Sequence, residues 1–355
     1  MNEKRGYVEY LARIAVLAAV FLIISACGGG HEVGEVTRPT APSTEGMVAS
    51  PTATVAPLLE ASLICAEPFD EEVPGIVGSA ELNEISGLVA SRSNPGVLWV
   101  HNDSGDSPRV FAMTSEGEDL GSYNLVGADA VDWEDMAIGP GPVPATDYLY
   151  LADIGDNPRE RSEVAIYRVP EPAVAGGEAA VTHDLTGVER LTLRYPDRAH
   201  DSETLLVDPI SGDLFLVTKE VAGGDAFVFR APASWEVAGT ATLEHVGEID
   251  FIGLESGLDF PEDAPPLVRG AGFLPTAGDV SPDGGAIAIR TYSTVWVWAR
   301  AAGSELAEAF SSEPCEGPSA SEAQGEAIGF DPDGTGYFTV SEGTNPPLYH
   351  FSHSQ

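Results

Sequence analysis

The stretch "EDMAIGPGPVPATDYLYLADIGDN", residues 134–157, has an order that recurs along the chain. An acidic residue, Glu134, opens a short apolar segment. A turn rich in Pro and Gly follows, and a second apolar segment with aromatic residues then ends in polar ones. Short apolar segments bounded by Gly, Pro and Asp are typical of β-strands joined in a hairpin. The stretch therefore predicts two antiparallel strands with a carboxylate at the start of the first.

Four other segments repeat this order. "EISGLVASRSNPGVLWVHNDSGD" starts at Glu84, "ETLLVDPISGDLFLVTKE" at Glu203 and "EAIGFDPDGTGYFTVSEG" at Glu326. "TAGDVSPDGGAIAIRTYS" aligns through its SPDG turn, with Thr276 in place of Glu and Asp279 close by. The starts at 84, 134, 203, 276 and 326 are 50, 69, 73 and 50 residues apart. A third strand follows each pair and a fourth follows most, which is the size and content of a propeller blade.

The sequence therefore predicts an all-β fold, a single β-propeller with five blades. Six blades is the alternative, because residues 251–272 could contain part of another blade. A β-sandwich is the competing fold, which the regular repeat disfavours. The last copy ends after its third strand, and residues 74–82, "PGIVGSAEL", can supply its outer strand. Such a strand would close the ring without an unpaired edge.

The first 26 residues predict a lipoprotein signal peptide. Lys4, Arg5 and Arg13 give a positive start, and "IAVLAAVFLII" is too short to span a bilayer comfortably. "ISAC" resembles the lipobox of bacterial lipoproteins, which implies cleavage before Cys27 and lipidation of its thiol. The mature protein would then be exported and anchored to the bacterial membrane, facing the extracytoplasmic side. An ordinary signal peptide and a poor transmembrane helix are the alternatives.

Residues 27–57 follow as a flexible tether, because they are mostly Gly, Ser, Thr, Pro and Ala with few apolar anchors. Residues 58–355 remain for the propeller.

The charge balance excludes one class of partner. The chain has 56 acidic and 17 basic residues, a net charge of -39. Such a surface repels phosphate backbones, so we expect no nucleic-acid binding.

Of the three cysteines, one is the candidate for lipidation and the other two can form a disulfide. With Cys27 lipidated, Cys65 and Cys315 are an even pair in an oxidising compartment. The sequence predicts a disulfide between them that joins the N-terminal segment to the last part of the chain; two free thiols are the alternative.

The acidic residues near the strand starts form the candidate metal site. The innermost strand of each propeller blade lines the central channel, so its opening residues converge at one end of the axis. Carboxylates held close together cannot all stay ionised without a cation or a bound proton. Calcium takes about six to eight oxygen ligands, and no Cys/His cluster has zinc spacing. The expected Ca²⁺ ligands are Glu84, Asp132, Glu134, Asp135, Asp153, Glu203, Asp279 and Glu326.

A second polar set follows the second strands. The end of the second strand lies at the same face as the start of the first, so both sets build one polar funnel. The expected ligand-binding residues of this funnel are His101, Asn102, Asp103, Lys219, Arg290 and Glu342. The alternative role of "NDSGD" and "DIGDN" is to cap strands through Asx-turns.

Several motifs resemble known exported propellers. "EISGL", "DWEDMAI", "DSETLLV" and "QGEAIGF" resemble the phytase-like esterase and SdiA-regulated groups, and "HNDSGD" and "DIGDN" resemble strings in a family of actinobacterial lipoproteins. "SPDG" and "DPDG" turns are common in WD40-like blades and are weakly specific. The phytase-like resemblance implies a calcium-dependent hydrolase of phosphoesters or other esters.

Two functions follow. The favoured one is a cell-surface lipoprotein that binds a small-molecule or protein ligand at its acidic, calcium-occupied axial funnel, because no GxSxG elbow or Ser-His-Asp arrangement is present. In the hydrolase alternative, metal would activate a water, Glu134 or Asp135 would act as base, and Arg290 or Lys219 would steady the anion. Two cations are few for a highly phosphorylated substrate.

Overall fold

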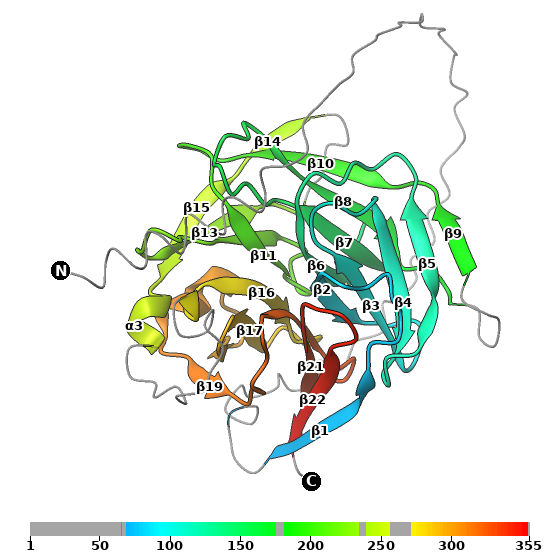
Figure 1. Cartoon of the computed structure of the whole chain (residues 1–355). Helices are drawn as coiled ribbons and strands as arrows, with labels where there is room; N and C mark the ends of the chain where they lie inside the picture. Colours follow the sequence, from blue (N-terminus) through cyan, green and yellow to red (C-terminus); the bar gives the residue numbers. More distant parts are fainter. Residues whose placement is uncertain (1–64, 66–68, 175–180, 234–238, 256–270, 354–355) are drawn as a thin grey trace, which may run out of the picture. The chain divides into compact units, whose positions relative to one another are not determined.

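The computed structural model describes residues 65, 69–174, 181–233, 239–255 and 271–353. Within these residues the all-β prediction is confirmed, because five sheets lie around a central axis as a five-bladed β-propeller (Figure 1). The predicted signal peptide, Cys27 and the tether at 27–57 lie outside the described residues. No helix in the described part of the chain is long and apolar enough to cross a bilayer.

The blades follow one another along the chain, and each runs from the axis outward. Blade 1 consists of β2 (Ile85–Ala90), β3 (Val97–Asn102), β4 (Arg109–Thr114) and β5 (Asp119–Leu125). Blade 2 consists of β6 (Trp133–Pro140), β7 (Asp147–Asp153), β8 (Val164–Pro170) and β10 (Glu189–Arg194). Blade 3 consists of β11 (Ser202–Val207), β12 (Leu214–Thr218), β13 (Ala226–Ala231) and β15 (Glu244–Ile249).

Blade 4 consists of β16 (Pro275–Val280), β17 (Ala286–Thr291), β18 (Val295–Ala299) and β19 (Cys315–Gly317). Blade 5 consists of β20 (Gly325–Phe330), β21 (Gly336–Ser341), β22 (Pro347–His353) and, from the other end of the chain, β1 (Phe69–Ile76). The short helix α3 (Phe251–Glu255) precedes blade 4, and a 3-10 helix (Leu306–Ser311) precedes β19.

The innermost strands form a closed ring. β2 contacts β6, β6 contacts β11, β11 contacts β16, β16 contacts β20, and β20 contacts β2. Because each of these strands has a neighbour on both faces, β2, β11, β16 and β20 are buried along their whole length and β6 over all but its last residue. This explains why apolar residues stand next to one another in these strands rather than in strict alternation with polar ones, as in "LLV" of β11 and "MAI" of β6.

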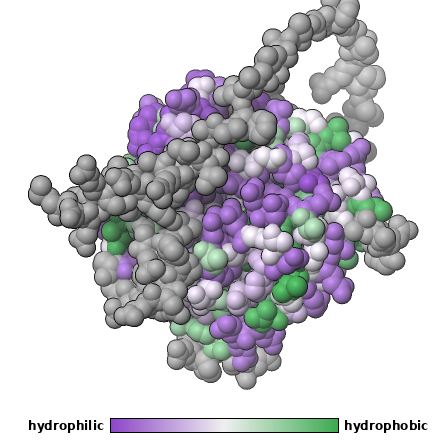
Figure 2. Space-filling model, viewed as in Figure 1, coloured by the Kyte–Doolittle hydropathy of each residue, from purple (hydrophilic) through white to green (hydrophobic). Residues whose placement is uncertain are grey.

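Apolar side chains fill the spaces between blades. Trp99 and Tyr123 of blade 1, whose ring centroids are 5.0 Å apart, share a buried cluster with Met136 and Leu149 of blade 2. Each large apolar side chain buried in this way contributes about 1.5–3 kcal/mol. On the face seen in Figure 2, the described residues are largely hydrophilic, with hydrophobic side chains in small, scattered areas.

The ring is closed by an N-terminal strand, as predicted, but the strand starts earlier. β1 pairs antiparallel with β22 from Phe69↔His353 to Ile76↔Pro347, so it overlaps the predicted range 74–82 only at residues 74–76. The prediction followed the apolar residues, and these are buried in the core instead, as Val77 and Leu82 show. An outer edge strand faces solvent, which suits the exposed acidic residues 70–72.

Two short strands connect neighbouring blades in a way that the sequence did not predict. β9 (Val181–Leu185) follows the third strand of blade 2 but pairs in parallel with β5 of blade 1. β14 (Thr240–Thr242) follows the third strand of blade 3 but pairs in parallel with β10 of blade 2. Each of these blades therefore has a fifth strand supplied by the chain of the next blade.

The predicted disulfide is present between Cys65 and Cys315, whose Cα atoms are 6.1 Å apart. Because Cys315 opens β19, the bond joins the N-terminal segment to the outer strand of blade 4. The six-blade alternative is not supported, because the described part of residues 251–272 contains α3 and no strand. A disulfide fits an extracytoplasmic protein.

Candidate functional site

Every innermost strand begins with a β-bulge, where one residue has no partner on the second strand. In blade 2, for example, Trp133 pairs with Asp153 and Asp135 with Ala152, so Glu134 is left between them. A bulge redirects the side chain of the extra residue. The five bulge residues are structurally equivalent and buried: Ser86, Glu134, Glu203, Thr276 and Glu326.

This equivalence differs from the sequence repeat in blade 1. The repeat aligned Glu84 with Glu134, but the bulge residue of blade 1 is Ser86, and Glu84 lies two residues earlier with its side chain exposed. The position two residues before the bulge is occupied by Glu84, Asp132, Asp201, Leu274 and Gln324.

A third set of residues lies just after the second strands. Their backbone N–H groups donate to the carbonyl oxygens of the residues two positions before the bulges, so the two sets are adjacent. This third set is Asp103, Gly155, Lys219, Tyr292 and Glu342. The three sets therefore lie together at the end of the ring where the innermost strands begin.

Five of these carboxylates form what we call the axial acidic cluster. Carboxylate oxygens of Asp103, Asp132 and Glu134 lie within 4.8 Å of one another, and those of Glu134, Asp201 and Glu203 do the same. Glu134 is common to both groups, so the cluster spans blades 1, 2 and 3. Glu134, Asp201 and Glu203 are almost fully buried, whereas Asp103 and Asp132 are half-buried.

Among the described residues, Lys219 is the cation in direct contact with a carboxylate of this cluster. Its Nζ atom lies 2.9 Å from Glu203 Oε1 and donates to the Tyr292 hydroxyl at 2.9 Å. Nζ also lies 5.0 Å from the centre of the Tyr292 ring, a cation–π distance. Burial alone would lower the pKa of Lys219, but the surrounding carboxylates, Glu203 above all, raise it well above its usual range. The neighbouring carboxylates therefore favour the charged ammonium over the neutral amine.

The carboxyl groups near the axis have raised pKa values. Burial, and then the charges of Asp103 and Glu203, raises the pKa of Asp132 to about 7. Burial, followed by the charge of Glu203, raises the pKa of Asp201 to about 6. The same causes raise the pKa of Glu134 well above its usual range. Lys219, Arg159 and Arg161 oppose these shifts without cancelling them, so bound protons or a further cation would relieve the repulsion among the carboxylates.

Two predicted residues of blade 5 border the cluster. Burial raises the pKa of Glu326 well above its usual range, and Lys219 is the neighbour that opposes this shift most. Burial and the charge of Asp103 raise the pKa of Glu342 to about 7. Glu326 also accepts a hydrogen bond from Gln324 at 2.8 Å. Blade 5 thus adds negative charge beside the cluster.

Two carboxylates predicted for the site, Asp135 and Asp279, connect blades instead. Asp135 accepts backbone hydrogen bonds from Met136 at 2.8 Å, Leu205 at 2.9 Å and Gly278 at 3.1 Å. The carboxylate of Asp279 accepts the N–H of Phe330 at 2.8 Å and of Val280 at 2.8 Å. Neither carboxylate belongs to a group of potential metal ligands among the described residues.

Arg290 is buried between blades 4 and 5. It contacts Glu322 at 2.6 Å and donates to the carbonyl oxygen of Ala327 at 3.1 Å. Its charge is therefore balanced locally rather than by the axial acidic cluster.

The remaining predicted residues hold the loops around the site. Asp153 accepts the N–H of Asp132 at 3.1 Å and pairs with Arg161 at 2.8 Å. His101 is fully buried, its Nδ1 atom lies 2.8 Å from the carbonyl oxygen of Asn102, and burial lowers its pKa to about 4. Asn102 donates to the Glu81 carbonyl oxygen at 2.7 Å. Each of these three side chains contacts a backbone group of the chain beside the cluster.

The sequence reasoning missed three residues of the site: Asp201, Tyr292 and Gly155. "DWE" and "DSE" share an Asp two residues before the bulge Glu, a signal that could have identified Asp201. Gly155 is required because a Cβ atom there would lie 2.0 Å from Glu134 Oε1 and 2.6 Å from Asp132 Oδ2. No sequence signal marked Tyr292, which precedes a polar turn like many other aromatic residues.

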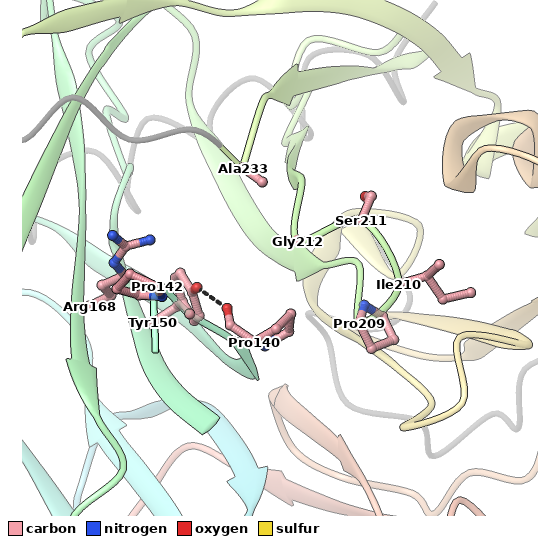
Figure 3. Close-up of a pocket in the computed structure, with 10 residues that line it drawn as sticks. Pro140, Pro142, Tyr150, Arg168, Pro209, Ile210, Ser211, Gly212 and Ala233 are labelled. Atoms are coloured by element: carbon pink, nitrogen blue, oxygen red, sulfur yellow. Dashed lines mark hydrogen bonds between the residues drawn. The ribbon is translucent and has the colours of Figure 1, made fainter. Parts of the chain in front are cut away.

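A separate pocket of about 380 Å³ lies between blades 2 and 3, beside the ends of β6 and β11 that are opposite to their bulges (Figure 3). It is lined by the turns that join the first and second strands of blades 2 and 3, including Pro140, Pro142 and Pro209. Its one charged described lining residue, Arg168, is paired with Glu189 at 2.6 Å. Unlike the axial acidic cluster, the pocket therefore has no carboxylate among its described lining residues.

Comparisons with known proteins support no family assignment. No family model matches the sequence, and no curated protein is similar to it. Two solved structures resemble the fold. Hydrazine synthase of Kuenenia stuttgartiensis is 12% identical with a TM-score of 0.38, and the match covers 76% of this chain and 96% of that one. An iodide structure of a Trichoderma reesei Carbohydrate-Active Enzymes Family AA12 protein is 11% identical with a TM-score of 0.39, and the match covers 86% of this chain and 100% of that one. These likenesses are too low to carry an argument about function.

Proposed function

We propose that the axial acidic cluster binds a divalent cation, Ca²⁺, and that the propeller uses the bound ion to hold a ligand at this end of the axis. The observation that carries the proposal is the position of Glu134, whose buried carboxylate belongs to both groups of potential ligands. A cation at Glu134 would replace the protons that the crowded carboxylates otherwise need.

The donor atoms favour calcium over transition metals. Both groups consist only of carboxylate oxygens. Hard oxygen ligands suit Ca²⁺ and Mg²⁺, whereas thiolate and imidazole ligands suit zinc and copper. Calcium accepts irregular coordination, which suits ligands that come from three blades, while Mg²⁺ demands a near-ideal octahedron. Coordination positions that the protein leaves open can accept oxygen atoms of a small-molecule or protein ligand.

We propose a cell-surface location for this activity. The lipobox-like "ISAC" before Cys27 supports lipid anchoring, and the disulfide between Cys65 and Cys315 supports an oxidising compartment. Extracellular calcium sites are commonly weak, with dissociation constants of about 10⁻⁴–10⁻³ M. A site exposed to the extracellular medium would be occupied by Ca²⁺ at such an affinity.

The hydrolase alternative has less support. It needs a cation that steadies an anionic substrate, and Arg290 is bonded to Glu322 while Lys219 is paired with Glu203. An activity screen on phosphoesters and carboxylic esters with calcium would detect it. Turnover that Glu134→Gln abolishes would favour the enzyme over the binding protein.

Calorimetric titration of the metal-free protein with Ca²⁺ tests the proposal. We expect saturable binding that Glu134→Gln weakens by at least tenfold and that Glu71→Gln, an exposed carboxylate on β1, leaves unchanged. Absence of binding by the wild-type protein, or equal binding by Glu134→Gln, would reject the metal site.

A further inference from the structure

Resting on this proposed function, we propose that Lys219 is a built-in cation that fills one of two cation positions in the axial acidic cluster. The metal ion then binds only to Asp103, Asp132 and Glu134. Removing the Lys219 ammonium opens a second metal position at Glu134, Asp201 and Glu203. Lys219 thus sets how many ions the propeller carries.

The two groups of carboxylates differ in the partners they already have. In the second group, Glu203 is bound by the Lys219 ammonium at 2.9 Å, and Asp201 accepts the backbone N–H of Asp156 at 2.8 Å. Two of its three carboxylates are thus occupied by groups of this chain. A metal ion entering there would have to displace or repel a charged ammonium.

The first group lacks such partners. Glu134 is only 3% exposed, and among the residues that the structure describes no hydrogen-bond donor or ion-pair partner reaches its carboxylate. Asp132 in the same group has no donor to its carboxylate within the described ranges either, and Asp103 receives only the N–H of the adjacent Ser104. A buried carboxylate without a partner is costly, and a bound cation removes that cost.

The position of Lys219 is fixed by its surroundings. Tyr292 of blade 4 receives a hydrogen bond from Nζ and presents its ring 5.0 Å away, so two contacts besides Glu203 hold the ammonium. Tyr292 and Lys219 occupy equivalent positions in adjacent blades. The ammonium is therefore held in contact with Glu203 of the second group by Tyr292 of the adjacent blade.

Ion stoichiometry tests this inference separately from the proposed function. Bound Ca²⁺ is counted by equilibrium dialysis and by calorimetry, in the wild-type protein and in Lys219→Met, which keeps the length of the side chain and removes its charge. We expect one ion per chain in the wild type and two in Lys219→Met. Lys219→Arg, which keeps the charge, serves as the matched control and should bind one.

Each outcome separates the two claims. No ion in the wild type rejects the proposed function and this inference with it. One ion in both the wild type and a folded Lys219→Met supports the function and rejects the inference. Should Lys219→Met fail to fold, anomalous scattering from Tb³⁺ in wild-type crystals decides: one ion at Asp103, Asp132 and Glu134 supports the inference, and an ion beside Asp201 and Glu203 overturns it.

Discussion

Asp135 Oδ2 lies 3.1 Å from the amide nitrogen of Gly278, a residue 143 positions away in the sequence and two blades further round the ring. The same oxygen atom accepts the N–H of Leu205 in the intervening blade at 2.9 Å. One carboxylate therefore ties three innermost strands together. Its neighbour in sequence, Glu134, points instead into the axial acidic cluster, so adjacent carboxylates have separate roles.

This separation predicts different effects for two similar substitutions. In Asp135→Asn, an NH₂ group replaces one carboxylate oxygen and faces backbone N–H groups that then have no acceptor. We therefore expect the free energy of unfolding to fall by about 2–3 kcal/mol. Calcium affinity should stay within twofold of the wild type. Urea unfolding and calorimetry check the two quantities. Loss of calcium binding with unchanged stability would instead place Asp135 among the metal ligands.

The pKa values of the cluster predict an unusual dependence of stability on pH. Asp132 and Glu342 titrate at about 7 in the folded protein and Asp201 at about 6, against about 4 for unfolded carboxyl groups. The folded state then binds more protons than the unfolded state, so the stability of the metal-free protein falls as pH rises from about 4 to about 7.

Melting temperatures of the metal-free protein between pH 5 and pH 7 measure this effect. We expect a steady fall over this range, a smaller fall in Asp132→Asn, and near-constant values with saturating Ca²⁺. Calcium binding should also release protons at pH 6, which titration in buffers of different ionisation enthalpy detects. Stability that rises with pH in the metal-free protein would contradict the assigned shifts.

Gly155 gives a test of the cluster that removes no carboxylate. A methyl group at this position would lie 2.0 Å from Glu134 Oε1, so Gly155→Ala must push Glu134 or Asp132 out of place. We expect calcium affinity to fall at least tenfold. Gly247→Ala on β15 is the matched control, because a Cβ atom there meets nothing within 4 Å. Equal affinities in both variants would mean that Glu134 does not bind the ion.

The repeat made the fold predictable, because each blade carries its own strand, turn and strand signals. The start of β1 was not predictable in the same way. Its sequence, "FDEEVPGI", is acidic and exposed, and it is a strand only because β22 would otherwise have an open edge. β9 and β14 were missed for a similar reason, since each pairs in parallel with a strand of another blade. Pairing of this kind depends on tertiary structure rather than on local propensity.

The site was predictable in outline and less so in detail. The sequence grouped Glu134 with Glu203 because an acidic residue opens four of the five repeats, and in the structure both are bulge residues of innermost strands. It could not separate Glu134 from Asp135, since a bulge decides which of two adjacent carboxylates turns toward the cluster. A one-residue change of register reverses the direction of a side chain, and sequence alone does not fix that register.

The disulfide supplies the final prediction. It joins Cys65 to Cys315 over a separation of 250 residues, and Cys315 opens the outer strand of blade 4, next to the blade that β1 completes. Cys315→Ser should lower the free energy of unfolding by about 2–4 kcal/mol. Because neither cysteine contacts the axial acidic cluster, calcium affinity measured below the melting transition should be unchanged. Thermal unfolding with and without reductant checks the effect: the wild type should lose stability on reduction and Cys315→Ser should not. Equal losses in both proteins would mean that reductant acts elsewhere and that the bond does not stabilise ring closure.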